Sequence, residues 1–283
     1  MTASNLACRA LLALLLLALP AAAARAQSAA APYEPEVGQA GKDVVWVPTD
    51  QPLVEKMLDL ARVTPRDYVI DLGSGDGRTV IAAARRGARA LGIEYNPDLV
   101  ELSRRNAAKA GVAERARFVR GDIFESDFSQ ATVVTLFLLP ELNLKLRPKL
   151  LDMKPGTRVV SNSFTMGEWQ ADRTVKATSE EGCNSYCTAY LWIVPAKVAG
   201  TWRLAQGEGE LTLKQSFQMI SGTLRAGGVE TAVRGRLRGE EISFTAGTAR
   251  YTGRVSGDLI KGAVRSDKGR AEWSATRAAQ PAT

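Results

Sequence analysis

The 283-residue sequence contains no histidine. This absence excludes a histidine general base, a serine–histidine–aspartate triad and any metal centre that depends on imidazole ligands. Cysteine is scarce, with three residues, and no run of lysine and arginine marks a site for nucleic acid or for an anionic membrane. The chemistry left to the chain is that of carboxylates, hydroxyls, backbone amides and a bound cofactor. With 45% hydrophobic and 24% charged residues, the composition is that of a folded globular protein, and the formal net charge is a mild +7.

The N-terminus has the layout of an export signal. Arg9 supplies a positive charge, residues 10–19 form an unbroken apolar run, and residues 24–26 (Ala-Arg-Ala) offer the small-x-small pattern that precedes signal-peptidase cleavage. The run is shorter than the roughly 20 apolar residues that span a bilayer, so an uncleaved anchor is the less favoured alternative. We therefore expect residues 1–26 to be a signal peptide, cleaved near Ala26. We expect the mature protein to be periplasmic, with no stable membrane span.

The segment after the expected cleavage site is typical of a flexible leader, because residues 27–42 are rich in Ala, Pro, Gln and Gly. After cleavage two cysteines remain, Cys183 and Cys187. In an oxidising compartment a C-x-x-x-C pair closes a small disulfide loop, whereas two thiols without histidine make a poor zinc site. The sequence therefore favours a disulfide and no metal centre.

The order of the predicted elements indicates two domains. Between residues 43 and 196 short apolar runs alternate with helical patterns, which is typical of a Rossmann-like, doubly wound α/β sheet. Segments 174–178 and 186–194 are expected to add an antiparallel pair at one edge. From residue 197 to 283 the helical period disappears and β-prone runs are broken by glycines. This second segment predicts a small antiparallel barrel or sandwich of about eight strands.

A glycine-rich loop with acidic flanks follows the first predicted strand. It reads Asp71-Leu72-Gly73-Ser74-Gly75-Asp76-Gly77 and lies where open α/β sheets bind ligands. A nicotinamide dinucleotide site has the spacing G-x-G-x-x-G, with its third glycine one position later than Gly77. Carboxylates beside the loop suit a positively charged ligand better than a pyrophosphate. This contrast favours S-adenosylmethionine, whose sulfonium and amino groups are cationic, over NAD.

Two further acids end the next two predicted strands, Glu94 before Tyr95-Asn96 and Asp122 within Gly121-Asp122-Ile123. Together with the loop they resemble the motifs of class I S-adenosylmethionine-dependent methyltransferases. The resemblance implies that Glu94 accepts both ribose hydroxyls and that Asp122 reads the adenine amino group. The alternative is that these acids cap the helices that follow them. The residues expected to hold the cofactor are Asp71, Gly73, Ser74, Gly75, Asp76, Gly77, Glu94, Tyr95, Asp122 and Ile123.

A narrower resemblance covers roughly residues 44 to 170. The segments that carry it are Trp46-Val47-Pro48-Thr49, residues 69–78, Phe137-Leu138-Leu139-Pro140 and Arg158-Val159-Val160-Ser161-Asn162-Ser163-Phe164. They are similar to the ATP-synthase c-subunit lysine N-methyltransferase family. In that family the segment after the fourth strand, together with the helix before the glycine loop, faces the methyl group, so the resemblance implies that Leu139 and Pro140 wall the transfer site. The exported leader and the β-rich tail are not part of the family pattern.

The resemblance implies methyl transfer to an amine, in the first place a protein lysine. A lysine amine must lose a proton before it attacks, through desolvation, to water, or to a carboxylate such as Glu141. A glutamate in a first helical turn is also a simple complement to the helix dipole. Tyr95 and Trp169 are expected either to line an apolar channel or to lie in the core. A small-molecule acceptor on the same fold and a non-catalytic exported binding protein remain alternatives.

Overall fold

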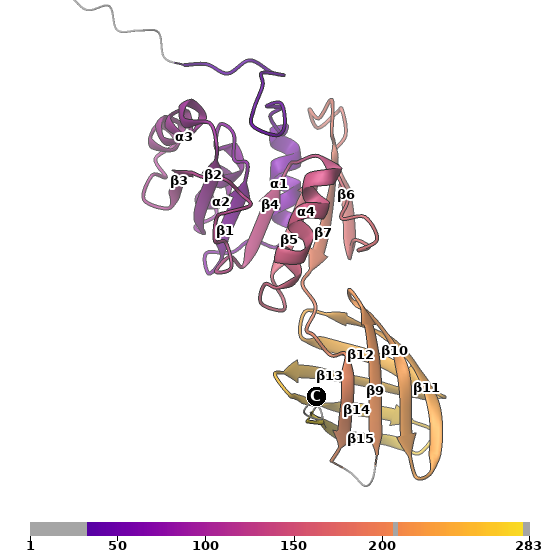
Figure 1. Cartoon of the computed structure of the whole chain (residues 1–283). Helices are drawn as coiled ribbons and strands as arrows, with labels where there is room; N and C mark the ends of the chain where they lie inside the picture. Colours follow the sequence, from indigo (N-terminus) through magenta and orange to yellow (C-terminus); the bar gives the residue numbers. More distant parts are fainter. Residues whose placement is uncertain (1–32, 206–208, 280–283) are drawn as a thin grey trace, which may run out of the picture. The chain divides into compact units, whose positions relative to one another are not determined.

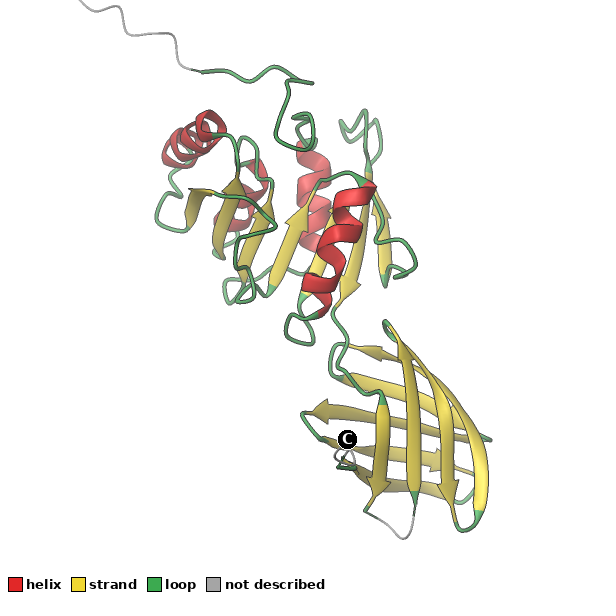
Figure 2. Ribbon diagram, in the orientation of Figure 1, coloured by secondary structure: helices red, strands yellow, loops and turns green. Residues whose placement is uncertain are grey.

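Two separate β-sheets organise the protein, one mixed and one closed (Figures 1 and 2). The computed structural model describes residues 33–205 and 209–279. The expected signal peptide, residues 1–26, lies outside the described residues, as do residues 27–32 of the expected leader. Within the described ranges, no helix has both the length and the apolar character needed to cross a membrane.

The first sheet is the expected doubly wound one. Its strands are β1 (Tyr68–Leu72), β2 (Arg89–Glu94), β3 (Ala116–Arg120), β4 (Val133–Leu136), β5 (Arg158–Asn162), β6 (Arg173–Lys176) and β7 (Thr188–Ile193). Their order across the sheet is β3-β2-β1-β4-β5-β7-β6. The first five strands pair in parallel, whereas β7 pairs antiparallel with both β5 and β6. The fold class and the antiparallel edge pair expected from the sequence are both confirmed.

The helices of the described residues begin at recognisable sequence signals. They are α1 (Gln51–Leu60), α2 (Arg78–Arg85), α3 (Pro97–Lys109) and α4 (Pro140–Leu151). At the start of α3 the side chain of Asn96 accepts a hydrogen bond from the Asp98 N–H at 2.9 Å, and Pro97 occupies the first helical position. A proline likewise stands in the first turn of α1 and of α4.

The mixed sheet is buried on both faces. Neighbouring residues of β1, Val69 and Ile70, belong to two different core clusters, because successive side chains of a strand point to opposite faces. One cluster holds the apolar sides of α1, α2 and α3, and the other holds that of α4. This double covering explains the continuous apolar runs of the sequence. It leaves the carboxyl ends of the parallel strands as the edge at which ligand-binding side chains collect.

The second sheet is a closed antiparallel barrel of eight strands. They are β8 (Gly200–Leu204), β9 (Glu210–Ser216), β10 (Met219–Ala226), β11 (Val229–Arg238), β12 (Glu241–Ala246), β13 (Ala249–Ser256), β14 (Leu259–Ser266) and β15 (Gly269–Arg277). The barrel closes because β8 pairs with both β9 and β15. Trp202, Phe244 and Trp273 belong to its core cluster. The sequence was compatible with either a barrel or a sandwich, and the pairing of β8 with both β9 and β15 shows that the domain is a barrel.

Candidate functional site

A cavity of about 520 Å³ lies at the carboxyl ends of β1, β2, β3 and β4. Its wall contains the glycine loop after β1, Glu94 of β2, residues 121–123 after β3, and residues 136–139 at the end of β4. This is the edge at which open parallel sheets bind ligands, and the volume is in the range of small-molecule sites. All the residues expected to hold the cofactor line this cavity except Gly77.

Gly77 does not line the cavity and is closely packed. It precedes α2 with φ 84°, in the left-handed region that favours glycine. A Cβ atom at this position would lie 2.7 Å from the Phe118 ring and 2.9 Å from Cβ of Ser103. Its N–H donates to the carbonyl of Ser74 at 2.9 Å. The third glycine of the loop therefore lets α2 start close to β3 and α3.

Glu94 is fixed by two backbone N–H groups. Its Oε2 accepts from Gly75 at 2.9 Å, and its Oε1 accepts from Asn96 at 2.9 Å. The first bond joins the end of β2 to the glycine loop, and the second joins it to the start of α3. An ionised carboxylate offers about four lone-pair sites, so both oxygens keep acceptor capacity for ligand hydroxyls. This arrangement fits the ribose role that the resemblance implied.

Asp71 is a buried acid that faces the cavity. Burial raises its pKa to about 7, and the negative charges of Glu94 and Asp76 act in the same direction. The hydroxyl of Thr135, on the neighbouring strand β4, donates to Oδ1 of Asp71 at 2.6 Å and opposes the rise of the pKa. No lysine or arginine of the described ranges is paired with this carboxyl. A cationic ligand beside Asp71 would therefore stabilise its ionised form.

Asp122 is held by groups on two sides. Its Oδ1 accepts from the Phe124 N–H at 2.9 Å, and its Oδ2 accepts from the Lys42 ammonium at 2.5 Å. The hydrogen bond from Lys42 keeps the pKa of Asp122 below its ordinary value. Residues 39–42, which the sequence placed in a flexible leader, line the cavity. They do so because Ala40 forms a β-bridge with Val45, which folds this segment back.

The residues expected at the transfer site separate into two groups. Leu139 lines the cavity and is 43% exposed, as a contact residue for a substrate should be. Pro140 and Glu141 are exposed in the first turn of α4 and do not line the cavity. Glu141 therefore lies where an acid in the first turn complements the helix dipole. Trp169 is fully buried in the core, whereas Tyr95 lines the cavity.

Several lining residues were not singled out from the sequence as site residues. Trp46 lies so close to the glycine loop that a Cβ atom on Gly75 would be 2.6 Å from its Nε1. Phe137, Phe164 and Tyr186 line the cavity as well. An aromatic residue just after an apolar strand was the available signal for Phe137. Nothing local in the sequence indicated Tyr186.

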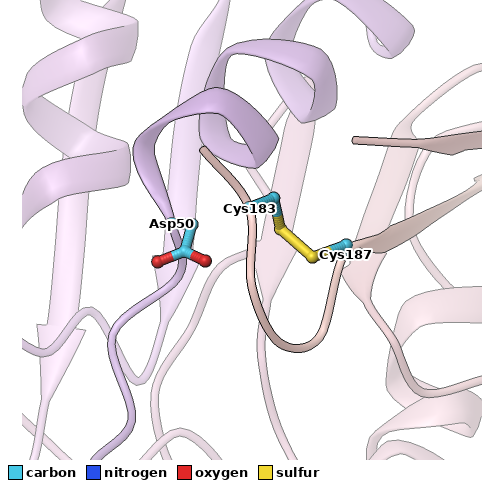
Figure 3. Close-up of side chains that lie close together, drawn as sticks. All are labelled: Asp50, Cys183 and Cys187. Carbon is cyan, nitrogen blue, oxygen red and sulfur yellow. A yellow bond between two sulfur atoms is a disulfide. The ribbon is translucent and has the colours of Figure 1, made fainter. Parts of the chain in front are cut away.

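The two cysteines that follow the expected cleavage site form the predicted disulfide. Cys183 and Cys187 are bonded, with a Cα–Cα distance of 5.8 Å. The carboxylate of Asp50 lies beside the bridge (Figure 3). Among the described residues these three form a group whose possible ligand atoms lie within 4.8 Å of one another. Because the two sulfurs are bonded to each other, the group is a disulfide with a neighbouring acid and not a dithiolate ligand set.

The wall of the cavity fits S-adenosylmethionine. Glycines let the backbone come close at the end of β1, and carboxylates from β1, β2 and the end of β3 surround one space. A positively charged neighbour stabilises the ionised carboxylate of Asp71, and the sulfonium and amino groups of the cofactor carry such charges. Asp71, Glu94 and Asp122 are the residues that would hold the cofactor, with the apolar residues after β4 beside the transferred group.

The chain is similar to known methyltransferases. A family model described as the ANTKMT methyltransferase domain matches residues 71–173. A protein-lysine N-methyltransferase of Saccharolobus islandicus is 44% identical over 154 residues, which is 53% of this chain and 94% of that protein. The ATP-synthase c-subunit lysine N-methyltransferase of Mus musculus is 39% identical over 130 residues, which is 46% of this chain and 52% of that protein.

One solved structure is similar over the same half of the chain. It is described as an RNA methyltransferase from Salinibacter ruber in complex with S-adenosylhomocysteine. The TM-score is 0.50 at 54% identity, over 54% of this chain and 96% of that one. The comparisons confirm the expected fold of the first domain and the expected cofactor.

Proposed function

Because this chain belongs to the family of S-adenosylmethionine-dependent methyltransferases that includes the protein-lysine N-methyltransferase of Saccharolobus islandicus, we propose that it methylates the side-chain amine of a protein lysine. The observation that carries the proposal is the extent of that similarity, which spans 94% of the relative. The wall of the cavity supports it, because carboxylates suited to a cationic cofactor are followed by the apolar residues Leu138, Leu139 and Leu142.

The described residues suggest how such a transfer proceeds. S-adenosylmethionine supplies an electrophilic methyl group on a sulfonium. Asp71 and Glu94 orient the cofactor, and Leu138 and Leu139 exclude water from the acceptor. Loss of hydration disfavours the ammonium form, so the pKa of the acceptor falls and the neutral, attacking amine is populated. Since Glu141 lies outside the cavity wall, we assign the removal of the proton to desolvation and water.

A second substrate class follows from the solved relative. The Salinibacter ruber protein is described as an RNA methyltransferase and is 54% identical over the matched half. The absence of a lysine and arginine run in this chain makes RNA the less favoured acceptor. A small-molecule amine remains a third candidate, because the fold does not determine the substrate.

The acceptor classes are separated by one transfer experiment. The full mature chain is incubated with methyl-labelled S-adenosylmethionine and, in parallel, with a protein extract, purified RNA and a set of small amines. We expect label in protein, recovered as methyllysine by mass spectrometry. Label confined to RNA or to small amines would replace the lysine proposal. Failure of both transfer and cofactor binding would support the non-catalytic alternative.

We further propose that the enzyme is exported and that its mature chain begins near Gln27. The signal-like pattern of residues 1–26 supports this, and the Cys183–Cys187 disulfide is typical of oxidising compartments. The measurement is the N-terminal sequence of the protein recovered from separated cell fractions. A cytosolic protein that keeps Met1 would contradict the proposal.

A further inference from the structure

Three aromatic rings form a triangle in the wall of the cavity. Phe137 follows β4, Phe164 lies just after β5, and Tyr186 lies just before β7. The ring centroid of Phe137 is 6.1 Å from that of Phe164 and 5.2 Å from that of Tyr186. The centroids of Phe164 and Tyr186 are 5.9 Å apart. Three segments that are distant in the sequence thus bring one ring each to the same place.

Within residues 33–205 and 209–279, no lysine or arginine is recorded over the faces of these three rings. Several lysine and arginine side chains of the described residues lie over aromatic rings, and none of them lies over Phe137, Phe164 or Tyr186. Tyr186 is 47% exposed, and the two phenylalanines are half-buried. Open aromatic faces in a cavity attract alkyl chains through apolar contact and ammonium groups through cation–π interactions.

Two of the three rings lie on or next to a residue with a left-handed backbone conformation. Ser163, which precedes Phe164, has φ 57°, and Tyr186 has φ 55°. Residues with side chains seldom adopt this left-handed region, and β-carbon crowding makes it costly. Such conformations persist where the surrounding structure enforces them, and they concentrate at functional sites. The fold therefore holds these two loops in conformations that turn their rings toward the cavity.

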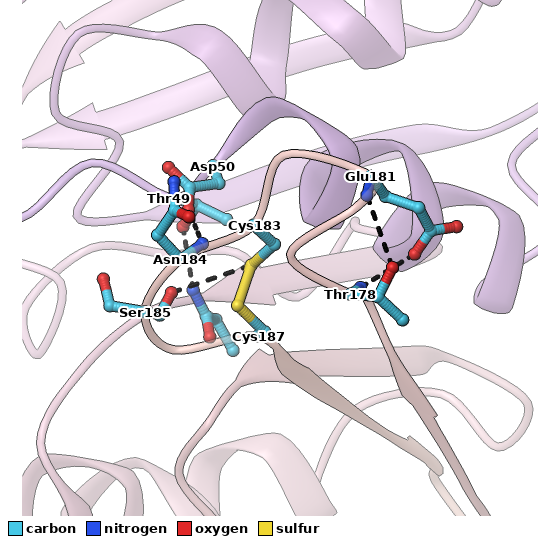
Figure 4. Close-up of a disulfide and its surroundings, with 9 residues drawn as sticks. Thr49, Asp50, Thr178, Glu181, Cys183, Asn184, Ser185 and Cys187 are labelled. Atoms are coloured by element: carbon cyan, nitrogen blue, oxygen red, sulfur yellow. Dashed lines mark hydrogen bonds between the residues drawn. A yellow bond between two sulfur atoms is a disulfide. The ribbon is translucent and has the colours of Figure 1, made fainter.

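The loop that carries Tyr186 is held by the disulfide and by backbone hydrogen bonds. The disulfide between Cys183 and Cys187 closes the loop around it (Figure 4). The N–H of Asn184 donates to Oδ2 of Asp50, the residue that precedes α1, at 2.9 Å. The bridge restricts the loop, and the hydrogen bond attaches it to the wall of the first domain. The N–H of Cys183 also donates to the carbonyl of Thr178 at 3.0 Å, and the carbonyl of Cys187 accepts from the N–H of Ala177 at 2.9 Å. Between these anchored ends the disulfide is the covalent restraint on the strained backbone of Tyr186.

We infer that Phe137, Phe164 and Tyr186 form an aromatic subsite that binds the alkylammonium end of the methyl acceptor before the amine loses its proton, and that the Cys183–Cys187 disulfide keeps Tyr186 in this subsite. The inference rests on the proposed amine acceptor. The family-model match ends at residue 173, so Tyr186 and its disulfide belong to a segment outside the matched domain.

The subsite is tested by binding, without any transfer reaction. The probes are choline, a soluble quaternary alkylammonium, and dimethylbutanol, its uncharged carbon isostere, each titrated by NMR into the full mature chain saturated with S-adenosylhomocysteine. We expect choline to bind more tightly than the isostere. Tyr186→Ala should weaken choline binding at least about fivefold, and Tyr186→Phe should change it less than about twofold because the ring is kept.

A second variant separates the ring from the strained backbone. Tyr186→Asn places a residue that tolerates the left-handed region at this position, so it removes the ring without adding strain. We expect it to lose choline binding as Tyr186→Ala does, while both variants keep the affinity for S-adenosylhomocysteine within about twofold. Choline binding that is unchanged in Tyr186→Asn, or that falls together with cofactor affinity, would overturn the inference.

The role of the disulfide is tested with a reductant. Dithiothreitol reduces the Cys183–Cys187 bond by thiol–disulfide exchange, which leaves two thiols and converts the reductant to its cyclic disulfide. EDTA is added, because the freed thiols and Asp50 form a possible metal-ligand set. We expect reduction to weaken choline binding by the wild-type protein, and the Cys183→Ser/Cys187→Ser variant to be weak with or without reductant. Equal choline affinity in the oxidised and reduced protein would remove the disulfide from the inference.

The binding results and the transfer results are independent of each other. If choline binds through Tyr186 but no lysine is methylated, the subsite stands and the proposed protein substrate is wrong. If lysine is methylated and Tyr186→Asn retains both choline binding and the wild-type KM for the protein acceptor, the proposed function stands and the subsite is wrong.

Discussion

The ammonium of Lys42 lies 2.5 Å from Oδ2 of Asp122, although the two residues are 80 positions apart in the sequence. The same ammonium is 5.3 Å from the ring centroid of Tyr95. The pKa of Lys42 is raised, first by its hydrogen bond to Asp122, and the pKa of Asp122 is lowered by the same bond. Lys42 therefore keeps Asp122 ionised and oriented at the end of the cavity formed by residues 121–123.

Replacing Lys42 should weaken cofactor binding slightly. Lys42→Met removes the hydrogen bond that orients Asp122, and solvent screens exposed ion pairs, so we expect only a modest effect: up to about fivefold weaker binding of S-adenosylhomocysteine by calorimetry. The matched control is Lys197→Met, which breaks an ion pair with Asp152 of the same length, 2.5 Å, outside the cavity wall. An identical affinity in both variants would show that Lys42 has no part in binding.

Replacing Glu94 should weaken cofactor binding strongly. Glu94→Ala removes an acceptor for ligand hydroxyls, and it leaves the N–H groups of Gly75 and Asn96 without their partner. Hydrogen bonds to charged groups are worth about 1.5–3 kcal/mol each, so the affinity for S-adenosylmethionine should fall at least about tenfold. Glu101→Ala on the exposed side of α3 is the control, because Glu101 pairs with Arg104 and does not line the cavity. A folded Glu94→Ala protein with wild-type affinity would exclude the ribose role.

Asp71 should make the stability of the ligand-free protein depend on pH. Its pKa in the folded state is about 7, above the ordinary value of 3.8, so between these two values the folded state binds more protons than the unfolded state. The free energy of unfolding therefore decreases as pH rises from about 4 to about 7, by an amount on the order of 4 kcal/mol at most. Asp71→Asn removes this contribution.

The measurement is denaturant unfolding of wild type and Asp71→Asn across pH 4 to 8, roughly the window that the shifted pKa defines. The difference in unfolding free energy between the two proteins should change with pH below about 7 and become constant above it. Parallel curves over the whole window would mean that the carboxyl titrates normally. Binding of S-adenosylmethionine to the wild-type protein should strengthen as Asp71 ionises across the upper part of the window.

Gly77 should be intolerant of a side chain for steric reasons. Gly77→Ala places a Cβ atom within 3 Å of Phe118 and Ser103 and in a left-handed conformation. The control is Gly111→Ala, which has a similar φ of 68° and no atom within 4 Å of the added carbon. Gly111→Ala should cost about 1–2 kcal/mol of unfolding free energy for the backbone alone, and Gly77→Ala should cost more. If thermal or denaturant unfolding shows that both variants lose the same amount of stability, close packing does not exclude a side chain at Gly77.

Much of the fold was predictable because its signals are local. The apolar run at β1 predicts a buried strand, Asn96-Pro97 predicts the start of α3, and the glycine rhythm after residue 197 predicts short antiparallel strands. The carboxylates Asp71 and Glu94 were predictable for the same reason, since each stands at the end of a strand. The close packing around Gly77 was not predictable, because its neighbours Phe118 and Ser103 come from later segments.

The sequence by itself determined the types and order of the elements, the acidic glycine loop and the pair of cysteines, because each is encoded by residues that are neighbours in the chain. Only the tertiary structure decided which distant residues complete the cavity. Lys42 and Trp46 come from before α1, and Tyr186 comes from the disulfide loop before β7. These contacts depend on the strand order β3-β2-β1-β4-β5-β7-β6, which is set by packing both faces of the sheet together. The closure of the barrel is also a tertiary feature, because β8 pairs with β9, which follows it directly, and with β15, the last strand of the chain.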